Sequence, residues 1–441
     1  MTKFYRLLAL GALIGVGAWL SARSHGEPTV DNKGRPIPTI APAPRPAQNL
    51  EANLADSKFA SAPLHVYEQL NGARLFGAQV KPELPSAPAR KRDYVILVST
   101  SAAQAGAGWI GANQITEAFI ETANEGDRIA LWFVSTSEAT KALTDGLLDA
   151  KADAAQLEQA KQKLKKQYPS GTTDLKSALV KAMDTFSGGG DHRQRVLLFL
   201  GDGQSTANPL DHEARANLCK DMVARKIAFF AVPLGLQLDP ANLHGFATGT
   251  GGMVMRTRVT EEKLTDALKR YQEALAAPIM YGAKITLPAA VTEVYPRELP
   301  PLRGDAPTLL VGRMKAAQSL DYTVTGTVAG LATPTTVNVS LEVPVAEADN
   351  FFLISMVDQW AKAQTQPALL RADRALLLAY NQSMVLHKDL LINADEAIKR
   401  NELDGAARLF AEAQKMSPRD GEAAAGLKIV AKLKDGTLTR E

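Results

Sequence analysis

The chain has 441 residues, enough for two or three domains, and 46% of them are hydrophobic, which excludes disorder throughout. Its 50 Lys and Arg residues nearly balance 47 Asp and Glu residues, for a formal net charge of +3. This balance, with only 6% aromatic residues, argues against a polyanionic partner, and we expect binding of neither nucleic acid nor nucleotide.

Residues 1–22 form a targeting segment. Lys3 and Arg6 precede the apolar run Leu7–Leu20, of about 14 residues, which is typical of a signal peptide and shorter than the roughly 20 residues that span a bilayer. Small residues around Ala22 offer a cleavage point. The alternative is an uncleaved membrane anchor at the N-terminus. In both cases we expect export to the periplasm or cell envelope.

A Pro-rich linker and lead-in are predicted at residues 23–90. Prolines alternate with other residues between positions 36 and 46, which favours extended polyproline II and cannot bury a core. A short helical stretch is expected around Val66 to Leu75, and further prolines follow it.

Apolar strands and amphipathic helices alternate from residue 91 to residue 278, as in a domain with a mostly parallel sheet. Strands are expected at 94–98, 128–134, 196–200 and 227–232, and helices at 113–124, 152–166, 175–186, 211–226 and 261–277. A glycine turn at 247–252 is expected to lead into a short strand. The fold class predicted for this region is α/β, doubly wound and Rossmann-like.

Three loops of this region carry a polar pattern. The first buried strand is followed by Ser99-Thr100-Ser101-Ala102-Ala103. A Gly-Thr-Thr loop containing Thr173 follows the fourth predicted element, and a second buried strand ends at Asp202-Gly203. The carboxyl ends of strands in an open α/β sheet are where such folds bind ligands.

The order of these motifs resembles the von Willebrand factor type A (VWA) family. That family holds Mg²⁺ at a metal-ion-dependent adhesion site made of Asp-x-Ser-x-Ser, a Thr and a late Asp. The resemblance implies that Ser101, Thr173 and Asp202 are retained ligands. It places Ser99 and Ala103 at the positions of two lost ligands, so the adhesion site is degenerate.

Loss of these two ligands weakens the case for a metal. Mg²⁺ needs near-octahedral oxygen ligation with one or two carboxylates, whereas Ala103 supplies no oxygen and Ser99 supplies a neutral hydroxyl. We expect no cofactor, with weak or absent affinity for Mg²⁺ or Ca²⁺. The alternative role of Ser101, Thr173 and Asp202 is a hydrogen-bonded cluster that closes three loops.

Residues 280–350 are predicted to form a small antiparallel β-sandwich. Strands expected at 283–287, 308–313, 320–328 and 335–343 are separated by Pro and Gly. The segment Tyr295–Asp305, followed by Val311-Gly312-Arg313, resembles the region after the VWA domain in the inter-alpha-trypsin-inhibitor heavy-chain family. The alternative is a generic sandwich whose prolines mark edges and turns.

Residues 351–441 are expected to be helical. A repeat at about 387–420 resembles a tetratricopeptide (TPR) repeat, because its second helix carries the small–large–small–Pro pattern of Ala406, Phe410, Ala413 and Pro418. The resemblance implies that these four residues form the core of the repeat, with Phe410 filling the gap between its two helices. The alternative is a helical hairpin without that relationship. Because stacked arrays need several repeats, this one would have to pack on neighbouring helices.

Sequence motifs of enzymes are missing. There is no Gly-x-x-x-x-Gly-Lys-Ser/Thr, His-Glu-x-x-His or Gly-x-Ser-x-Gly, and the single cysteine, Cys219, lies in a helical pattern as a small buried hydrophobe. We therefore expect a non-enzymatic interaction or scaffold protein of the bacterial cell envelope.

We expect such a protein to bind its protein partners through the loops at the carboxyl ends of the strands and through the TPR-like tail. Gln204, Ser205 and Asn208 are the candidate partner-binding residues. Two alternatives remain: a metal-dependent adhesin or receptor with a remade site, and an enzyme with an unrecognised site.

Overall fold

The computed structural model describes residues 57–186, 193–256, 263–364, 368 and 370–438. The predicted targeting segment and residues 23–56 of the predicted linker and lead-in lie outside these residues. No helix among them has the length and apolar character needed to cross a membrane.

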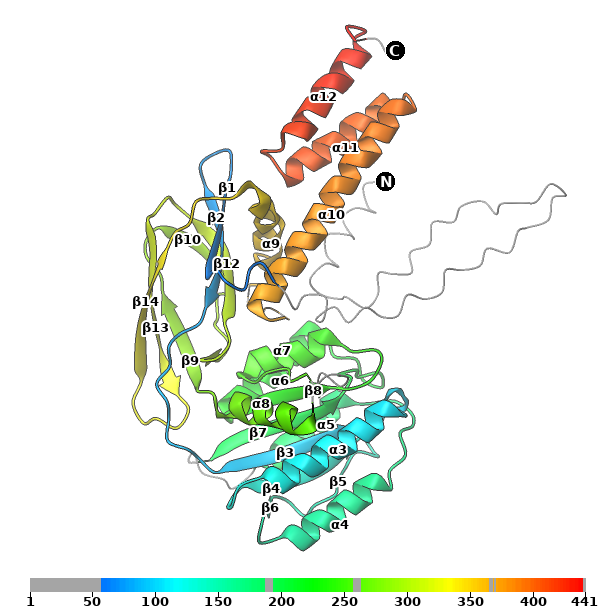
Figure 1. Cartoon of the computed structure of the whole chain (residues 1–441), viewed down its shortest axis with the longest axis vertical. Coiled ribbons are helices and arrows are strands. Elements are labelled where there is room, and N and C mark those ends of the chain that lie inside the picture. The colour runs from blue at the N-terminus through cyan, green and yellow to red at the C-terminus, as the bar shows by residue number, and fades with distance from the viewer. Residues whose placement is uncertain (1–56, 187–192, 257–262, 365–367, 369, 439–441) are drawn as a thin grey trace, which may run out of the picture.

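The α/β region is built on one mixed sheet, in the strand order β5-β4-β3-β7-β8, with β6 also paired to β4 (Figure 1). Its parallel strands are β3 (Arg92–Ser99), β4 (Arg128–Val134), β7 (Gln194–Gly201) and β8 (Ile227–Pro233). The short strands β5 (Lys141–Ala142) and β6 (Leu148–Asp149) run antiparallel to β4. Strands β3, β7 and β8 are buried on both faces, which explains their continuous apolar sequences.

Helices cover both faces of this sheet. One face packs on α3 (Ala107–Thr122), α4 (Ala154–Lys165) and α8 (Leu264–Ala276). The other packs on α5 (Leu175–Asp184), α6 (His212–Ala224) and α7 (Pro240–Thr250). The predicted doubly wound α/β fold is therefore confirmed.

Helix α7 replaces the turn that was expected around residues 247–252. Asp239 caps the helix by accepting from the backbone N–H of Asn242, and Pro240 occupies its first turn. Gly249 lies inside the helix. A Cβ at this position would come within 2.7 Å of the Cys219 sulfur, so a glycine is needed there. Gly251 ends the helix in the left-handed conformation, and the expected short strand is reduced to a bridge between Ala231 and Val254.

A β-sandwich is built from strands that precede the α/β region in sequence and strands that follow it. One sheet has the order β1-β2-β12-β10 and the other β11-β9-β13-β14. The strands are β1 (Leu64–Glu68), β2 (Arg74–Val80), β9 (Ile279–Thr286), β10 (Val291–Tyr295), β11 (Leu302–Arg303), β12 (Thr308–Met314), β13 (Ser319–Val328) and β14 (Thr335–Glu342).

The expected helix around Val66 to Leu75 is wrong, because this segment forms β1, a turn and the start of β2. Strand β2 pairs with β12 over its whole length, so successive side chains face opposite layers. Phe76 enters the sandwich core, while Leu75 faces the helices outside it. Far from being only a lead-in, this segment supplies two strands of the sheet.

The first of the two sheets is covered on its outer face by helices. The elements are η2 (Ala348–Phe351), α9 (Phe352–Trp360) and the first half of α10 (Ala372–Lys399). Phe59, which precedes β1, packs edge-on against the rings of Phe352 and Tyr380. The second half of α10 continues beyond the sandwich (Figure 1).

The C-terminal helices form a small core of their own. Helices α11 (Leu403–Met416) and α12 (Gly421–Lys434) pack beside the second half of α10. The predicted core residues Ala406, Phe410 and Ala413 are buried there, and Pro418 lies in the turn between α11 and α12. Helical structure in the tail is confirmed, and its relationship to TPR repeats stays a prediction.

Candidate functional site

The three loops singled out in the sequence meet at the carboxyl edge of the α/β sheet. The N–H of Ala102 donates to the carbonyl of Gly171 at 3.1 Å, and the N–H of Ser170 donates to the carbonyl of Thr100 at 2.8 Å. The N–H of Ala207 donates to the carbonyl of Thr173 at 3.0 Å. Backbone hydrogen bonds thus tie the loops after β3 and β7 to the loop before α5.

Asp202 is the charged centre of this edge and is 1% exposed. One of its oxygens accepts the backbone N–H of Gln204 at 2.9 Å. The other accepts the Ser101 hydroxyl at 3.4 Å and the Gln104 side-chain amide at 3.1 Å. Burial raises the pKa of the Asp202 carboxyl, and these hydrogen bonds act in the opposite direction. Ser101 and Asp202, predicted to lie together, are therefore in contact.

Gln104 was missed by the sequence analysis. It closes the short helix η1 (Ala102–Gln104) and is fully buried. Its amide nitrogen also donates to the carbonyl of Leu234, at 3.1 Å, in the loop after β8. The only signal in the sequence is a polar residue in a loop of small ones, which does not reveal a partner 98 positions away.

Ser99 and Ala103, at the lost ligand positions, differ in their exposure to solvent. Ser99 is buried, and its hydroxyl accepts the backbone N–H of Ser101 at 3.4 Å. Ala103 is exposed and offers only a methyl group. Neither side chain brings a carboxylate to the site.

Thr173 is buried, and among the described residues its hydroxyl makes no hydrogen bond. This hydroxyl is the feature of the predicted ligand set that still fits a ligand. The adjacent Asp174 serves the fold, because it caps α5 by accepting from the N–H and the hydroxyl of Ser177.

The donor set does not fit Mg²⁺ or Ca²⁺. Such ions need several oxygen ligands including carboxylates, whereas here one carboxylate, Asp202, already accepts three hydrogen bonds. One of these three bonds comes from the side-chain amide of Gln104, which occupies an oxygen that a cation would need. Within the described part of the chain, no group of three His, Cys, Asp or Glu side chains is placed to hold a metal.

The predicted partner-binding residues differ in their exposure. Gln204 is partly buried, and its amide donates to the carbonyl of Gln237 at 2.9 Å. Asn208 is also partly buried and donates to Asp174 at 3.5 Å. Ser205 is buried, and its hydroxyl accepts from the N–H of Leu175 and donates to the carbonyl of Asn208. The hydroxyl of Ser205 therefore holds the loop rather than facing solvent.

Large apolar side chains surround this polar centre and face solvent. Leu236 is 89% exposed, Tyr168 82% and Ile110 58%. Leu236 follows β8, Tyr168 lies just before the loop that bonds to Thr100, and Ile110 is in the first turn of α3. The first turn of α3 lies against the loop after β8, because a Cβ on Gly108 would be 3.5 Å from the nitrogen of Gly235.

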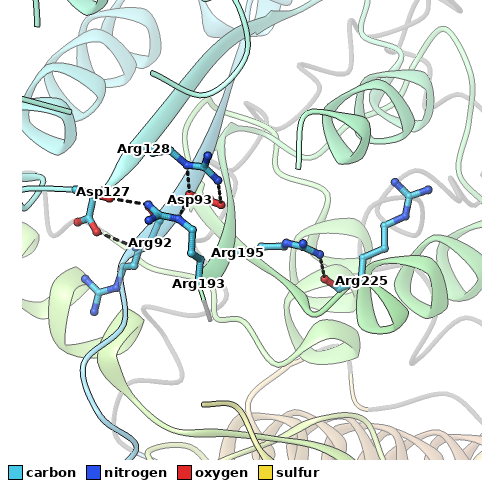
Figure 2. A network of polar contacts seen from close by, with 8 residues as sticks. Arg92, Asp93, Asp127, Arg128, Arg193, Arg195 and Arg225 are labelled. Atoms are coloured by element: carbon cyan, nitrogen blue, oxygen red, sulfur yellow. Dashed lines mark hydrogen bonds and ion pairs between the residues drawn. The ribbon is translucent and has the colours of Figure 1, made fainter. Parts of the chain in front are cut away.

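The opposite edge of the sheet carries a charged network with a structural role (Figure 2). Asp93 is fully buried and accepts two hydrogen bonds from Arg128, at 2.8 and 2.7 Å, and one from Arg193 at 2.6 Å. Arg193 also donates to the carbonyls of Arg92 and Gly126. These bonds join the amino ends of β3, β4 and β7, so the network holds the sheet together.

Cys219 is buried, and its thiol donates to the carbonyl of Gly245 at 3.7 Å. Burial raises the pKa of the Cys219 thiol to about 12, which disfavours the reactive thiolate. The prediction of a small buried hydrophobe is confirmed.

Part of the chain matches a known protein family. Residues 92–255 match the family model of the von Willebrand factor type A domain. Inter-alpha-trypsin inhibitor heavy chain H2 from Sus scrofa is 22% identical over 197 residues, which cover 43% of this chain and 20% of that protein. The chain thus matches about a fifth of the length of this curated relative.

Two solved structures of similar fold are a von Willebrand factor type A protein from Catenulispora acidiphila and the ArnB paralog VWA2 from Sulfolobus acidocaldarius. The first has a TM-score of 0.42 and 14% identity, covering 84% of this chain and 86% of that one. The second has a TM-score of 0.38 and 15% identity, covering 84% and 92%.

Proposed function

Because residues 92–255 form a von Willebrand factor type A domain, we propose that this protein acts by binding another protein and not by catalysis. The proposed binding surface, called the top face below, consists of the loops at residues 99–110, 168–174, 203–209 and 234–239. The proposed setting is a bacterial envelope, with the chain exported and serving as a scaffold.

The exposed apolar side chains of the top face carry this proposal. Tyr168, Leu236 and Ile110 come from three different loops around one edge of the sheet, where open α/β folds bind ligands. Exposed apolar side chains on this edge are candidates for the apolar contacts of a protein interface. Gln204 is bonded to Gln237 in the loop of Leu236 and Asn208 to Asp174 in the loop at 168–174, so both bring polar groups to the same loops.

The tail is proposed as a second binding surface, with a TPR-like origin. Val385, Leu386 and Ile392 on α10 are 61%, 48% and 50% exposed. Leu386 and Ile392 belong to the second half of α10, which continues beyond the sandwich, and Val385 is the last residue of the first half (Figure 1). A scaffold with two such surfaces would hold two partners at a separation fixed by the sandwich.

Site-specific crosslinking tests the top face. A photo-crosslinking residue at position 236 of the exported full-length protein is expected to give a discrete crosslinked product. The same residue at position 180, an exposed valine on α5, is the matched control and should give none. Ile110→Asp should abolish the product because it places a charge in the interface.

Two further variants separate the top face from the tail. Gln204→Ala with Asn208→Ala should weaken the product, and because it also removes the bonds of these side chains to Gln237 and Asp174 it should cost about 1–2 kcal/mol of stability. A product that survives Ile110→Asp but disappears when residues 387–441 are deleted would make the VWA domain a scaffold and the tail the binder.

One observation favours a second candidate, a metal-dependent adhesin or receptor: the buried Thr173 hydroxyl, which has no hydrogen bond among the described residues. An ion at 100 times its Kd that binds only the folded protein adds about 2.7 kcal/mol. We expect millimolar Mg²⁺ to leave the melting temperature unchanged. An EDTA-reversible rise would favour the adhesin, and Ser99→Asp with Ala103→Ser is expected to create such a rise.

A further inference from the structure

Gln104 bridges three loops of the top face from a fully buried position. The residue itself follows β3. Its amide nitrogen donates at 3.1 Å to Asp202, which follows β7, and at 3.1 Å to the carbonyl of Leu234, which follows β8. One side chain therefore connects the carboxyl ends of three neighbouring strands of the sheet.

The orientation of this amide is fixed by its partners. Both groups facing the nitrogen, a carboxylate oxygen and a backbone carbonyl, are acceptors. A flipped amide would place its own oxygen, which is also an acceptor, against the Asp202 carboxylate and the Leu234 carbonyl, and both hydrogen bonds would be lost. The nitrogen therefore supplies one hydrogen bond to the buried Asp202 carboxylate and one to the Leu234 carbonyl.

The surrounding backbone leaves room for this one side chain. A Cβ on Gly235 would lie 3.0 Å from the Gln104 amide nitrogen, and Gly235 has a φ of 108°, in the left-handed region. A Cβ on Gly108 would lie 3.1 Å from the Gln104 amide oxygen. A glycine in the loop after β8 and one in the first turn of α3 thus line the side chain closely, while its amide oxygen is buried and makes no hydrogen bond among the described residues.

We propose that the Gln104 amide takes the place of a cation at the top face. The amide donates a hydrogen bond to the Asp202 carboxylate and links the loops after β3, β7 and β8, as a bound ion would do. The top face is then assembled without divalent ions. This inference rests on the function proposed above. If the top face needs no metal, the protein recognises its partner by apolar contacts and hydrogen bonds and not by a partner carboxylate bound to a metal.

Replacing the amide with a carboxylate tests this role with metal ions as the probe. In the full-length protein, Gln104→Glu sets a second negative charge against Asp202. Its melting temperature in EDTA should fall by about 5 °C, and 5 mM Mg²⁺ or Ca²⁺ should restore it. The wild type should melt at one temperature in EDTA and in both ions.

Gln237→Glu is the matched control, because it makes the same change of charge on an exposed residue of the loop after β8. It should show no response to ions. Gln104→Met keeps the length of the side chain but has no donor, and it should melt about 3–5 °C lower in EDTA and in ions alike. This variant keeps the test decisive if Gln104→Glu does not fold.

Three results would overturn the proposal: an EDTA-reversible stabilisation of the wild type by Mg²⁺ or Ca²⁺, an unchanged melting temperature for Gln104→Met, or the same ion response for Gln104→Glu and Gln237→Glu. None of these measurements uses a partner. A failure here is therefore distinct from a failure of the crosslinking that tests the proposed function.

Discussion

His244 lies on α7, close enough to Arg374 at the start of α10 for that positive charge to act on it. It is 6% exposed, and burial, assisted by the positive charge of Arg374, lowers its pKa from 6.5 to about 3. The folded protein therefore keeps this imidazole neutral at pH values where the unfolded chain protonates it.

The consequence for stability follows from proton linkage. A lowered pKa in the folded state means that the unfolded chain binds more protons below pH 6.5, so stability is lost as the pH falls toward 3. Between pH 8 and pH 5 this group should cost about 2 kcal/mol. His244→Gln should remove that loss, measured as the difference in urea unfolding free energy between the two pH values.

His212 offers a control for this prediction. It lies at the start of α6 and is only partly buried. Burial also lowers the pKa of His212, but its side chain remains within reach of solvent. His212→Gln should therefore change the pH dependence less than His244→Gln. Equal pH dependence in wild type and His244→Gln would contradict the assignment.

At the scale of the element, α11 and α12 meet at a close contact. Phe410 on α11 is 2% exposed, and a Cβ on Gly426 of α12 would lie 2.4 Å from its ring. The glycine thus lets the aromatic ring fill the space between the helices. The alanines at positions 406 and 413 flank the same ring on α11.

Gly426→Ala should destabilise the tail by about 1–3 kcal/mol, because the added methyl overpacks this contact. The matched control is Gly405→Ala on α11, where a Cβ meets nothing closer than 3.8 Å and better helix propensity should stabilise by roughly 0.5–1 kcal/mol. Hydrogen exchange of residues 387–438 measures both effects. Equal behaviour of the two variants would contradict the packing argument.

At the scale of the whole molecule, the VWA domain is inserted into the sandwich. Strands β1 and β2 precede the domain in sequence, yet β2 pairs with β12 after it, from Arg74 opposite Met314 to Val80 opposite Thr308. Arg303 on β11 joins the two units by donating to the carbonyls of Gly251 and Ala274.

Deleting residues 57–80 should therefore unfold the sandwich and leave the VWA domain folded. The two cores of the VWA domain contain no residue from that segment, whereas both cores of the sandwich do. Hydrogen exchange should show lost protection over residues 291–342 and 352–376 and retained protection over 92–255. Leu70→Asp, at the exposed β1–β2 turn, is the control that should change neither region.

The sequence by itself determined the elements whose signals are local. Strand β4 was predicted with the bounds that the structure has, and β3, β7 and β8 within a few residues, because buried parallel strands are continuous apolar runs. The meeting of Ser101 with Asp202 is implied by the resemblance to the VWA family, and the parallel pairing of β3 with β7 brings both to one edge of the sheet. The burial of Phe410 followed from helical spacing.

Only the tertiary structure decided which distant segments pair. Nothing near Leu75 in sequence shows that β2 will pair with β12, more than 200 positions away, so the local pattern favours a helix where the fold makes a strand. In the same way, the sequence around Gln104 does not distinguish it from other polar loop residues. Its role depends on Asp202 and Leu234, which only the fold brings to its amide. Local patterns specify local structure, whereas the partners of a buried polar group or a strand edge depend on contacts that exist only after folding.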